Sequence, residues 1–185
     1  HVLVSFTMDQ LGIVLRLSGH PAEAVEQHRQ AQALREGAPG MPAMETAVAH
    51  VQYALSQADA NEFSAARSQV DNAVQVLAAT KPANPEQLAN ALLAQARIAL
   101  AQRDIDAGCA AVKKALELRP LDDPKTGWRH AEAQAVHGEC AAARREFALA
   151  RSELQTALAN LRRVRGNEHW MTRSVLQMLQ SVPKA

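Results

Sequence analysis

Apolar residues recur at three- and four-residue spacing along most of the chain, in stretches of helical length that are separated by short runs rich in Gly, Pro, Asn and Asp. In the first stretch Met8, Leu11, Val14 and Leu15 fall on one face, which predicts a helix over about 5–18. By the same criteria we expect helices over about 21–36, 42–58, 61–79, 85–103 and 104–119, a further pair on either side of a turn near 144–146, and a last helix over 169–182.

Small residues recur with a period of 42 along these predicted helices. Two helices pack closely only where their side chains are short, so the recurrence predicts a stacked array of helix pairs, each covered by the next. We therefore expect Gly108→Ala to fit, because Ala stands at the equivalent position in the other units. The positions are Gly12, Ala54, Ala96 and Gly138; Ala24, Ala66, Gly108 and Ala150; and Ala31, Ala73, Ala115 and Ala157.

At these twelve positions the chain resembles the tetratricopeptide repeat, and Pro120 fits the Pro that often follows the second helix of that motif. The usual tetratricopeptide period is about 34 residues. A period of 42 resembles the variant with longer helices and loops found in kinesin light chains and many bacterial signalling proteins, whose G-x-x-H ending matches Gly166 to His169. The resemblance implies an all-α, right-handed superhelix of about four helical hairpins and a C-terminal capping helix.

We expect a single repeat domain over 1–185, with units at about 5–40, 42–82, 85–122 and 125–166 and a cap over 168–182. The fourth unit has neither Gly nor Pro where the period requires a turn. We nevertheless place a turn near 144–146, because one long helix would leave its apolar face without a neighbour.

The composition is that of an ordinary soluble globular chain, with 48% hydrophobic and 21% charged residues. Aromatic residues make up only 3%, so the core must be built from close helix contacts and aliphatic side chains. A formal net charge of +1 gives no general attraction to nucleic acid, and no run of residues is long and apolar enough to insert into a membrane. The arginines of the last third are expected on a solvated helix face rather than in an anion site. The chain begins at His1 rather than Met, from which we expect a fragment of a longer protein.

The sequence offers little for catalysis, and we expect no enzyme activity, no cofactor and no metal site in this chain. Cys109, His130, His137 and Cys140 match no strong zinc spacing. His28 stands where later units have Val or Leu, which predicts a semi-buried structural histidine. Phosphate-binding loops and nucleophile elbows are absent from the sequence.

The resemblance places a ligand groove on the first helices of successive units, which line the concave side of such arrays. The expected groove is mostly apolar and suits an amphipathic helix, an extended apolar segment or a neighbouring part of the parent protein. The alternative is a superhelix tight enough for the groove to close on itself. Some members of the family hold a partner's C-terminal carboxylate with a set of basic and Asn side chains, and that set is not evident in this sequence. The expected ligand-binding residues are Ile13, Leu17, Val48, Val51, Leu55, Leu93, Arg97 and Leu100, with Phe6, Asp9, Arg16, Asn90, Glu132, Ala135 and Glu139 on the same side.

The two cysteines, Cys109 and Cys140, are placed by the period at matching heights on neighbouring antiparallel helices. Their sulfurs could therefore come within bonding range. Packing as two small buried thiols is the alternative. A bond would favour a periplasmic or extracellular location, since cytosolic thiols are normally kept reduced.

These observations predict a non-catalytic scaffold that binds a protein or peptide. The resemblance extends to the C-terminal sensory or docking regions of bacterial serine/threonine kinases, and a regulatory region of a bacterial transcription activator is the alternative. A small metal-binding helical domain is the third and weakest hypothesis. Attachment to a membrane-spanning kinase would place the chain in the periplasm, and otherwise we expect it in the cytoplasm. The oligomeric state is left open by the sequence.

Overall fold

The computed structural model describes residues 2–36, 40–119 and 127–184, so the expectation for Pro120 lies outside the described residues. Within these ranges every regular element is a helix and there is no strand, which confirms the all-α prediction. The helices are α1 (Val2–Leu17), α2 (Pro21–Glu36), α3 (Ala43–Asp59), α4 (Phe63–Ala79), α5 (Pro85–Ala101), α6 (Ile105–Glu117), α7 (Gly127–Ala143), α8 (Phe147–Arg165) and α9 (Trp170–Ser181).

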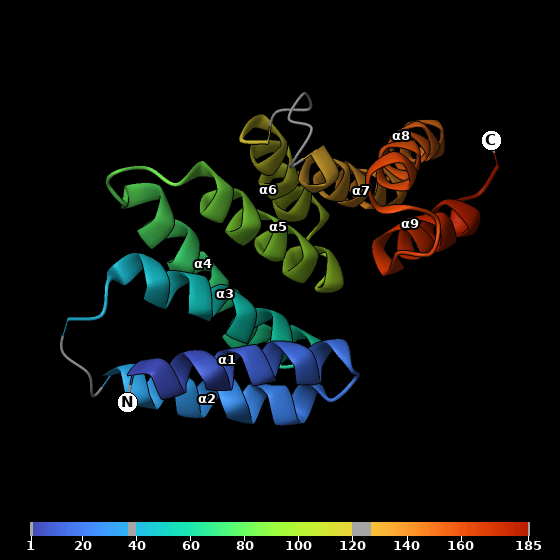
Figure 1. Ribbon diagram of the computed structural model, residues 1–185. Coiled ribbons are helices and arrows are strands. Elements are labelled where there is room, and N and C mark those ends of the chain that lie inside the picture. The colour runs from blue at the N-terminus through green and yellow to red at the C-terminus, as the bar shows by residue number, and fades with distance from the viewer. Residues whose placement is uncertain (1, 37–39, 120–126, 185) are drawn as a thin grey trace.

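The helices form successive pairs that stack into a curved array, with α1 and α2 at one end and α8 and α9 at the other (Figure 1). Within each pair the two helices contact each other along their length, and each second helix also contacts the first helix of the following pair. The first helices α1, α3, α5 and α7 contact one another in turn and so form one side of the array. Helix α9 packs on α8 as α7 packs on α6, although no second helix follows it within the described residues.

All twelve repeated small residues are buried, including Ala66 and Ala115 at 0% exposure. The apolar side chains around them form clusters that follow one another along the array. The expectation that Gly108→Ala fits is wrong, because an added Cβ would lie 2.8 Å from Leu100 Cγ. Leu100 of α5 lies against Gly108 of α6, and the two helices approach closely at this point only because Gly108 has no side chain.

The turn inside each pair has the same backbone conformation in all four units. Helix α7 ends at Ala143 and α8 begins at Phe147, so the turn of the fourth unit lies where the period predicted it. The residue after each turn donates its amide to a carbonyl five residues earlier, a helix-ending motif that needs one left-handed residue. That residue is Gly19, Asn61, Arg103 or Arg145, with φ of 85°, 65°, 62° and 64°, each 42 positions after the last.

The two ends of the array differ in polarity. Helix α1 exposes Val4, Leu11 and Val14 at positions where later first helices contact the preceding pair. At the other end, the side of α9 that faces away from α8 carries exposed polar residues such as Arg173 and Gln177. This side of α9 is therefore hydrated without the free-energy cost of exposing apolar side chains.

Candidate binding groove

A groove of about 500 Å³ runs along the side formed by the first helices and is bounded at its far end by α9. Each first helix contributes at least one residue, because the four helices lie side by side and present the same register to this side. The lining residues are Arg16 and Leu17 from α1; Val51, Gln52 and Leu55 from α3; Asn90, Leu93, Ala94 and Arg97 from α5; Glu132 from α7; and Trp170, Ser174 and Met178 from α9.

Five of the eight expected ligand-binding residues line this groove, but they are not equally accessible. Leu17 is 62% exposed, Leu55 is half-buried, and Arg97 is exposed. Val51 and Leu93 are 3% and 2% exposed and belong to the buried clusters, so they form the floor rather than free contact surface.

The remaining three expected residues lie elsewhere. Leu100 is directed against Gly108, between the two helices of the third pair. Val48 packs against the buried cluster of the second pair, and Ile13 is half-buried on α1 outside the lining. Asp9, expected on the same side, is buried at 6% exposure.

Three lining residues from α9, Trp170, Ser174 and Met178, were missed by the sequence reasoning, which assigned that helix only a covering role. Trp170 is 58% exposed and Met178 half-buried, and both face the groove, whereas Met171 and Val175 of the same helix are buried against the fourth pair. A signal for this existed, because Trp170 stands 42 positions after Trp128. The period therefore makes α9 the first helix of a further half-unit, and first helices line the groove.

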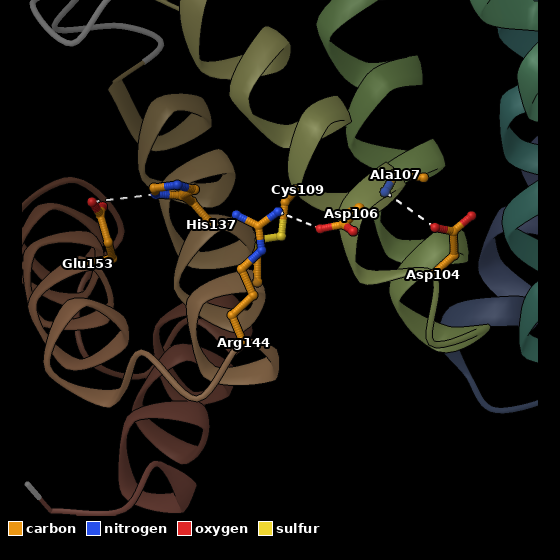
Figure 2. The surroundings of a disulfide bond; sticks show 8 residues. Asp104, Asp106, Ala107, Cys109, His137, Arg144 and Glu153 are labelled. Atoms are coloured by element: carbon orange, nitrogen blue, oxygen red, sulfur yellow. Dashed lines mark hydrogen bonds and ion pairs between the residues drawn. A yellow bond between two sulfur atoms is a disulfide. The ribbon is translucent and has the colours of Figure 1, made fainter.

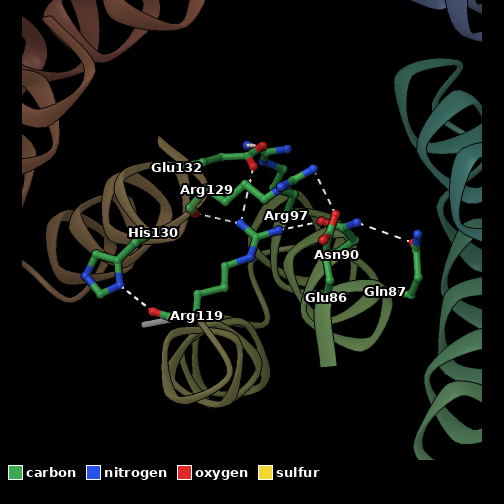
Figure 3. Close-up of polar contacts among 8 residues, drawn as sticks. All are labelled: Glu86, Gln87, Asn90, Arg97, Arg119, Arg129, His130 and Glu132. Atoms are coloured by element: carbon green, nitrogen blue, oxygen red, sulfur yellow. Dashed lines mark hydrogen bonds and ion pairs between the residues drawn. The ribbon is translucent and has the colours of Figure 1, made fainter. Parts of the chain in front are cut away.

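A cluster of charges crosses from α5 to α7 and includes the groove residues Arg97 and Glu132 (Figure 3). Arg97 Nη2 lies 3.0 Å from Glu132 Oε1, and the other oxygen of Glu132 lies 3.3 Å from Arg119 Nη1. Arg119 is 5% exposed, and it also donates to the Arg129 carbonyl at 2.7 Å and to the side-chain oxygen of Asn90. The buried guanidinium thus holds two groove residues, Asn90 and Glu132, in fixed positions.

Burial sets the direction of two pKa shifts near this cluster. Loss of water lowers the pKa of Arg119, against the opposing attraction of Glu132. Burial raises the pKa of Glu139 on α7, and the nearby Arg97 partly opposes the rise. On α1 the groove residue Arg16 pairs with Asp59 at 3.3 Å. The two arginines of the groove are therefore paired with carboxylates, and Leu17, Leu55, Trp170 and Met178 supply exposed or half-buried apolar surface beside them.

His28 is a structural residue in this fold. It is 1% exposed, stacks on Tyr53 with ring centroids 5.9 Å apart, and its Nδ1 lies 3.1 Å from Asp9 Oδ1. Asp9 is also paired with Arg35. Within the described part of the chain no group of three or more His, Cys, Asp or Glu side chains could hold a metal ion, and no helix is long and apolar enough to cross a membrane.

Comparison with known proteins gives matches at the level of structure. No protein-family model matches the chain, and no curated protein sequence matches it. The chain is similar to a putative kinesin light chain of Podosopora anserina with nearly identical TPR-like repeats, at TM-score 0.70 and 15% identity over 97% of this chain and 85% of that one. It is also similar to the apo form of RapI, at TM-score 0.73 and 13% identity over 96% of this chain and 62% of that one. A third match is BtubC from P. vanneervenii, at TM-score 0.62 and 17% identity over 84% and 59% of the two chains.

The fold is a tetratricopeptide-type array. The predicted right-handed superhelix of helical pairs is thereby confirmed. At these identities the likeness concerns the fold alone, and the array spans less than two thirds of RapI and of BtubC. What the groove of this tetratricopeptide-type array binds must therefore be argued from its own residues.

Proposed function

We propose that this chain is a non-catalytic protein-binding scaffold whose groove takes an apolar helix or extended segment of a partner protein. The groove carries the proposal. It presents Leu17, Leu55, Trp170 and Met178 to solvent across three helices, and its charged residues are already paired with one another or with neighbours. An apolar ligand would cover the exposed carbon surface without breaking these pairs.

The biological setting that we propose is a docking or sensory region of a larger bacterial signalling protein such as a serine/threonine kinase. The period of 42 and the G-x-x-H sequence at Gly166–His169 support this setting through their resemblance to such regions. A regulatory region of a transcription activator is the alternative.

Binding is tested by selecting ligands from a phage-displayed library of random peptides and titrating the best peptide against the purified chain. The test variant is Leu17→Asp with Leu55→Asp, which places two charges on accessible groove surface. Val51 is avoided because an Asp at a position 3% exposed would disrupt the fold. The matched control is Leu149→Asp, which charges an apolar residue of α8 that is 41% exposed and lies outside the groove.

We expect the double variant to weaken binding at least about tenfold, a loss of about 1.4 kcal/mol, and the control to bind normally. Peptide addition should also shift the fluorescence of Trp170, and Trp170→Phe should remove that shift. Equal affinity of the double variant and the control, with helicity intact in both, would show that the groove is not the binding surface.

A further inference from the structure

A second cavity, of about 210 Å³, lies between α6 and α7 on a disulfide between Cys109 and Cys140 (Figure 2). The two Cα atoms are 5.6 Å apart, and the two residues are 7% and 3% exposed. Both cysteines line the cavity. The other lining residues are Asp106, Ala110, Lys113, His137, Ala141, Arg144, Glu146 and Leu149.

The disulfide lies at a position that recurs in the sequence with the period of 42. By that period the equivalent pairs, each 31 residues apart, are Val25 with Ser56, Arg67 with Ile98, Cys109 with Cys140, and Arg151 with Val182. At the last of these positions Arg151 Nη1 donates to the Val182 carbonyl at 3.1 Å, without a covalent bond. The third pair is the one that carries two cysteines, and there the contact between the units is a disulfide.

Charged side chains surround the disulfide in this cavity. Lys113 follows Cys109 by one helical turn and Arg144 follows Cys140 by one turn, and both cations line the cavity. Two carboxylates line it as well, Glu146 and Asp106, and Asp106 of α6 pairs with Arg144 at 2.7 Å. Positive charge stabilises a thiolate over a thiol. Lys113 and Arg144 are therefore the residues that would stabilise a leaving cysteine thiolate, and the two carboxylates oppose them.

We propose that this cavity is a thiol–disulfide exchange site for small thiols, and that exchange there opens and closes the disulfide in the folded protein. A thiolate of the small molecule bonds to one cysteine sulfur, and the other cysteine leaves as a thiolate. A second small thiolate then bonds to the sulfur of the small molecule that is already attached, and the remaining cysteine leaves as a thiolate. Two small thiols are oxidised to their disulfide, one protein disulfide is reduced to two thiols, and the reverse reaction closes it.

The size of the cavity favours a small molecule as the reaction partner. The two cysteines are almost covered, and the cavity beside them has a volume of about 210 Å³, against about 500 Å³ for the binding groove. A protein oxidoreductase would need its own active-site surface to approach sulfurs that are 7% exposed or less.

Opening the disulfide would remove the covalent restraint between the third and fourth units. Non-covalent contacts would remain, among them the Arg119 cluster, which joins the C-terminal end of α6 to the N-terminal part of α7. The disulfide lies at the opposite ends of the same two helices. If the groove binds a peptide as proposed above, the position of Glu132 on α7 then depends on the redox state.

The exchange site is tested by following reduction of the oxidised chain with reduced glutathione under native conditions, using mass-shift alkylation of the thiols formed. The test variant is Ala110→Phe, which fills the cavity from an exposed position of α6. The matched control is Ala148→Phe, at an exposed position of α8 outside the lining. We expect Ala110→Phe to slow reduction at least about tenfold under native conditions, whereas all three chains should react alike in urea.

Native reduction that proceeds only at the rate of global unfolding would overturn the proposal, as would equal rates for Ala110→Phe and the control. Failure of the disulfide to form with oxidised glutathione would also overturn it. Hydrogen exchange supplies the structural readout: on reduction, amides of α7 should exchange faster while those of α3 keep their rates. None of these measurements uses a groove peptide, so their failure is distinct from failure of the proposed binding function.

Discussion

The buried histidine of the first pair predicts how stability depends on pH. Burial lowers the pKa of His28 to about 4, with a further contribution from Arg16. Asp9 does not reverse the shift, because Arg35 already compensates its charge. The Nε2 atom of His28 has no hydrogen-bond partner among the described residues, so a proton added there would be buried without an acceptor.

Below the ordinary histidine pKa of 6.5 the unfolded chain takes up a proton and the folded chain does not, until the pH approaches 4. The free energy of unfolding is therefore unaffected by His28 above pH 6.5. It falls as the pH is lowered from 6.5 towards about 4, by up to roughly 3 kcal/mol. Urea unfolding at pH 7 and pH 4.5 measures the loss. The variant His28→Val carries the residue that the second and third units have at the equivalent position, and it should reduce this loss of stability. Glu139 has a raised pKa and acts in the opposite direction, but it is common to both chains and cancels in the comparison. An equal pH dependence in both chains would contradict the assignment.

The repeated glycines of the array predict opposite outcomes in two backgrounds. Gly108→Ala should destabilise the chain by about 1–3 kcal/mol through overpacking, because its Cβ would lie 2.8 Å from Leu100 Cγ. When Leu100→Ala is already present, the closest remaining atom is the Ala96 carbonyl oxygen at 3.2 Å, a contact that a shift of a few tenths of an ångström relieves. The same change should then stabilise the chain by up to about 1 kcal/mol through helix propensity. Thermal melts of the four chains measure the coupling. A change of the same sign in both backgrounds would rule out the steric account.

The shared turn conformation predicts which substitutions each helical pair tolerates. Gly19 has φ 85°, and no neighbouring atom lies within 4 Å of the place that a Cβ would take, so any cost of a side chain there is a backbone cost. We expect Gly19→Ala to destabilise by about 1–2 kcal/mol. Gly19→Asn should cost less, since Asn tolerates the left-handed region and stands at the equivalent position 61. Chemical denaturation that ranks Asn below Ala would contradict this explanation.

The last helix separates stability from binding in the whole array. Met171, Val175 and Val182 are buried in the cluster of the fourth pair, whereas Trp170 faces the groove. Ending the chain after Gly166 should cost several kcal/mol, at about 1.5–3 kcal/mol for each large apolar side chain buried. Trp170→Ala should leave the melting temperature almost unchanged and weaken binding of the selected peptide. If the truncated chain melts like the full one, α9 does not stabilise the array.

Much of the fold could be predicted from spacing alone. A small residue every 42 positions determines where helices approach closely, and twelve such positions determine which helices are neighbours. The turn before Phe147 could be placed without any Gly or Pro for the same reason, since its conformation is imposed by the stacking of the pair. That conformation puts Arg103 and Arg145 in the left-handed region, which their residue type does not indicate.

The candidate groove was only partly predictable, because periodicity gives the face of a helix but not the depth of a residue on it. Val51 and Leu17 both belong to first helices, yet one is 3% and the other 62% exposed, since α3 has neighbours on both sides and α1 on one. The presence of Trp170 in the groove and the burial of Arg119 among Asn90, Glu132 and a carbonyl also depend on how the array curves. Local sequence sets the helices and their contact positions through side-chain size, whereas side-chain depth and the partners of buried charges are set by contacts between distant units, which exist only in the assembled stack.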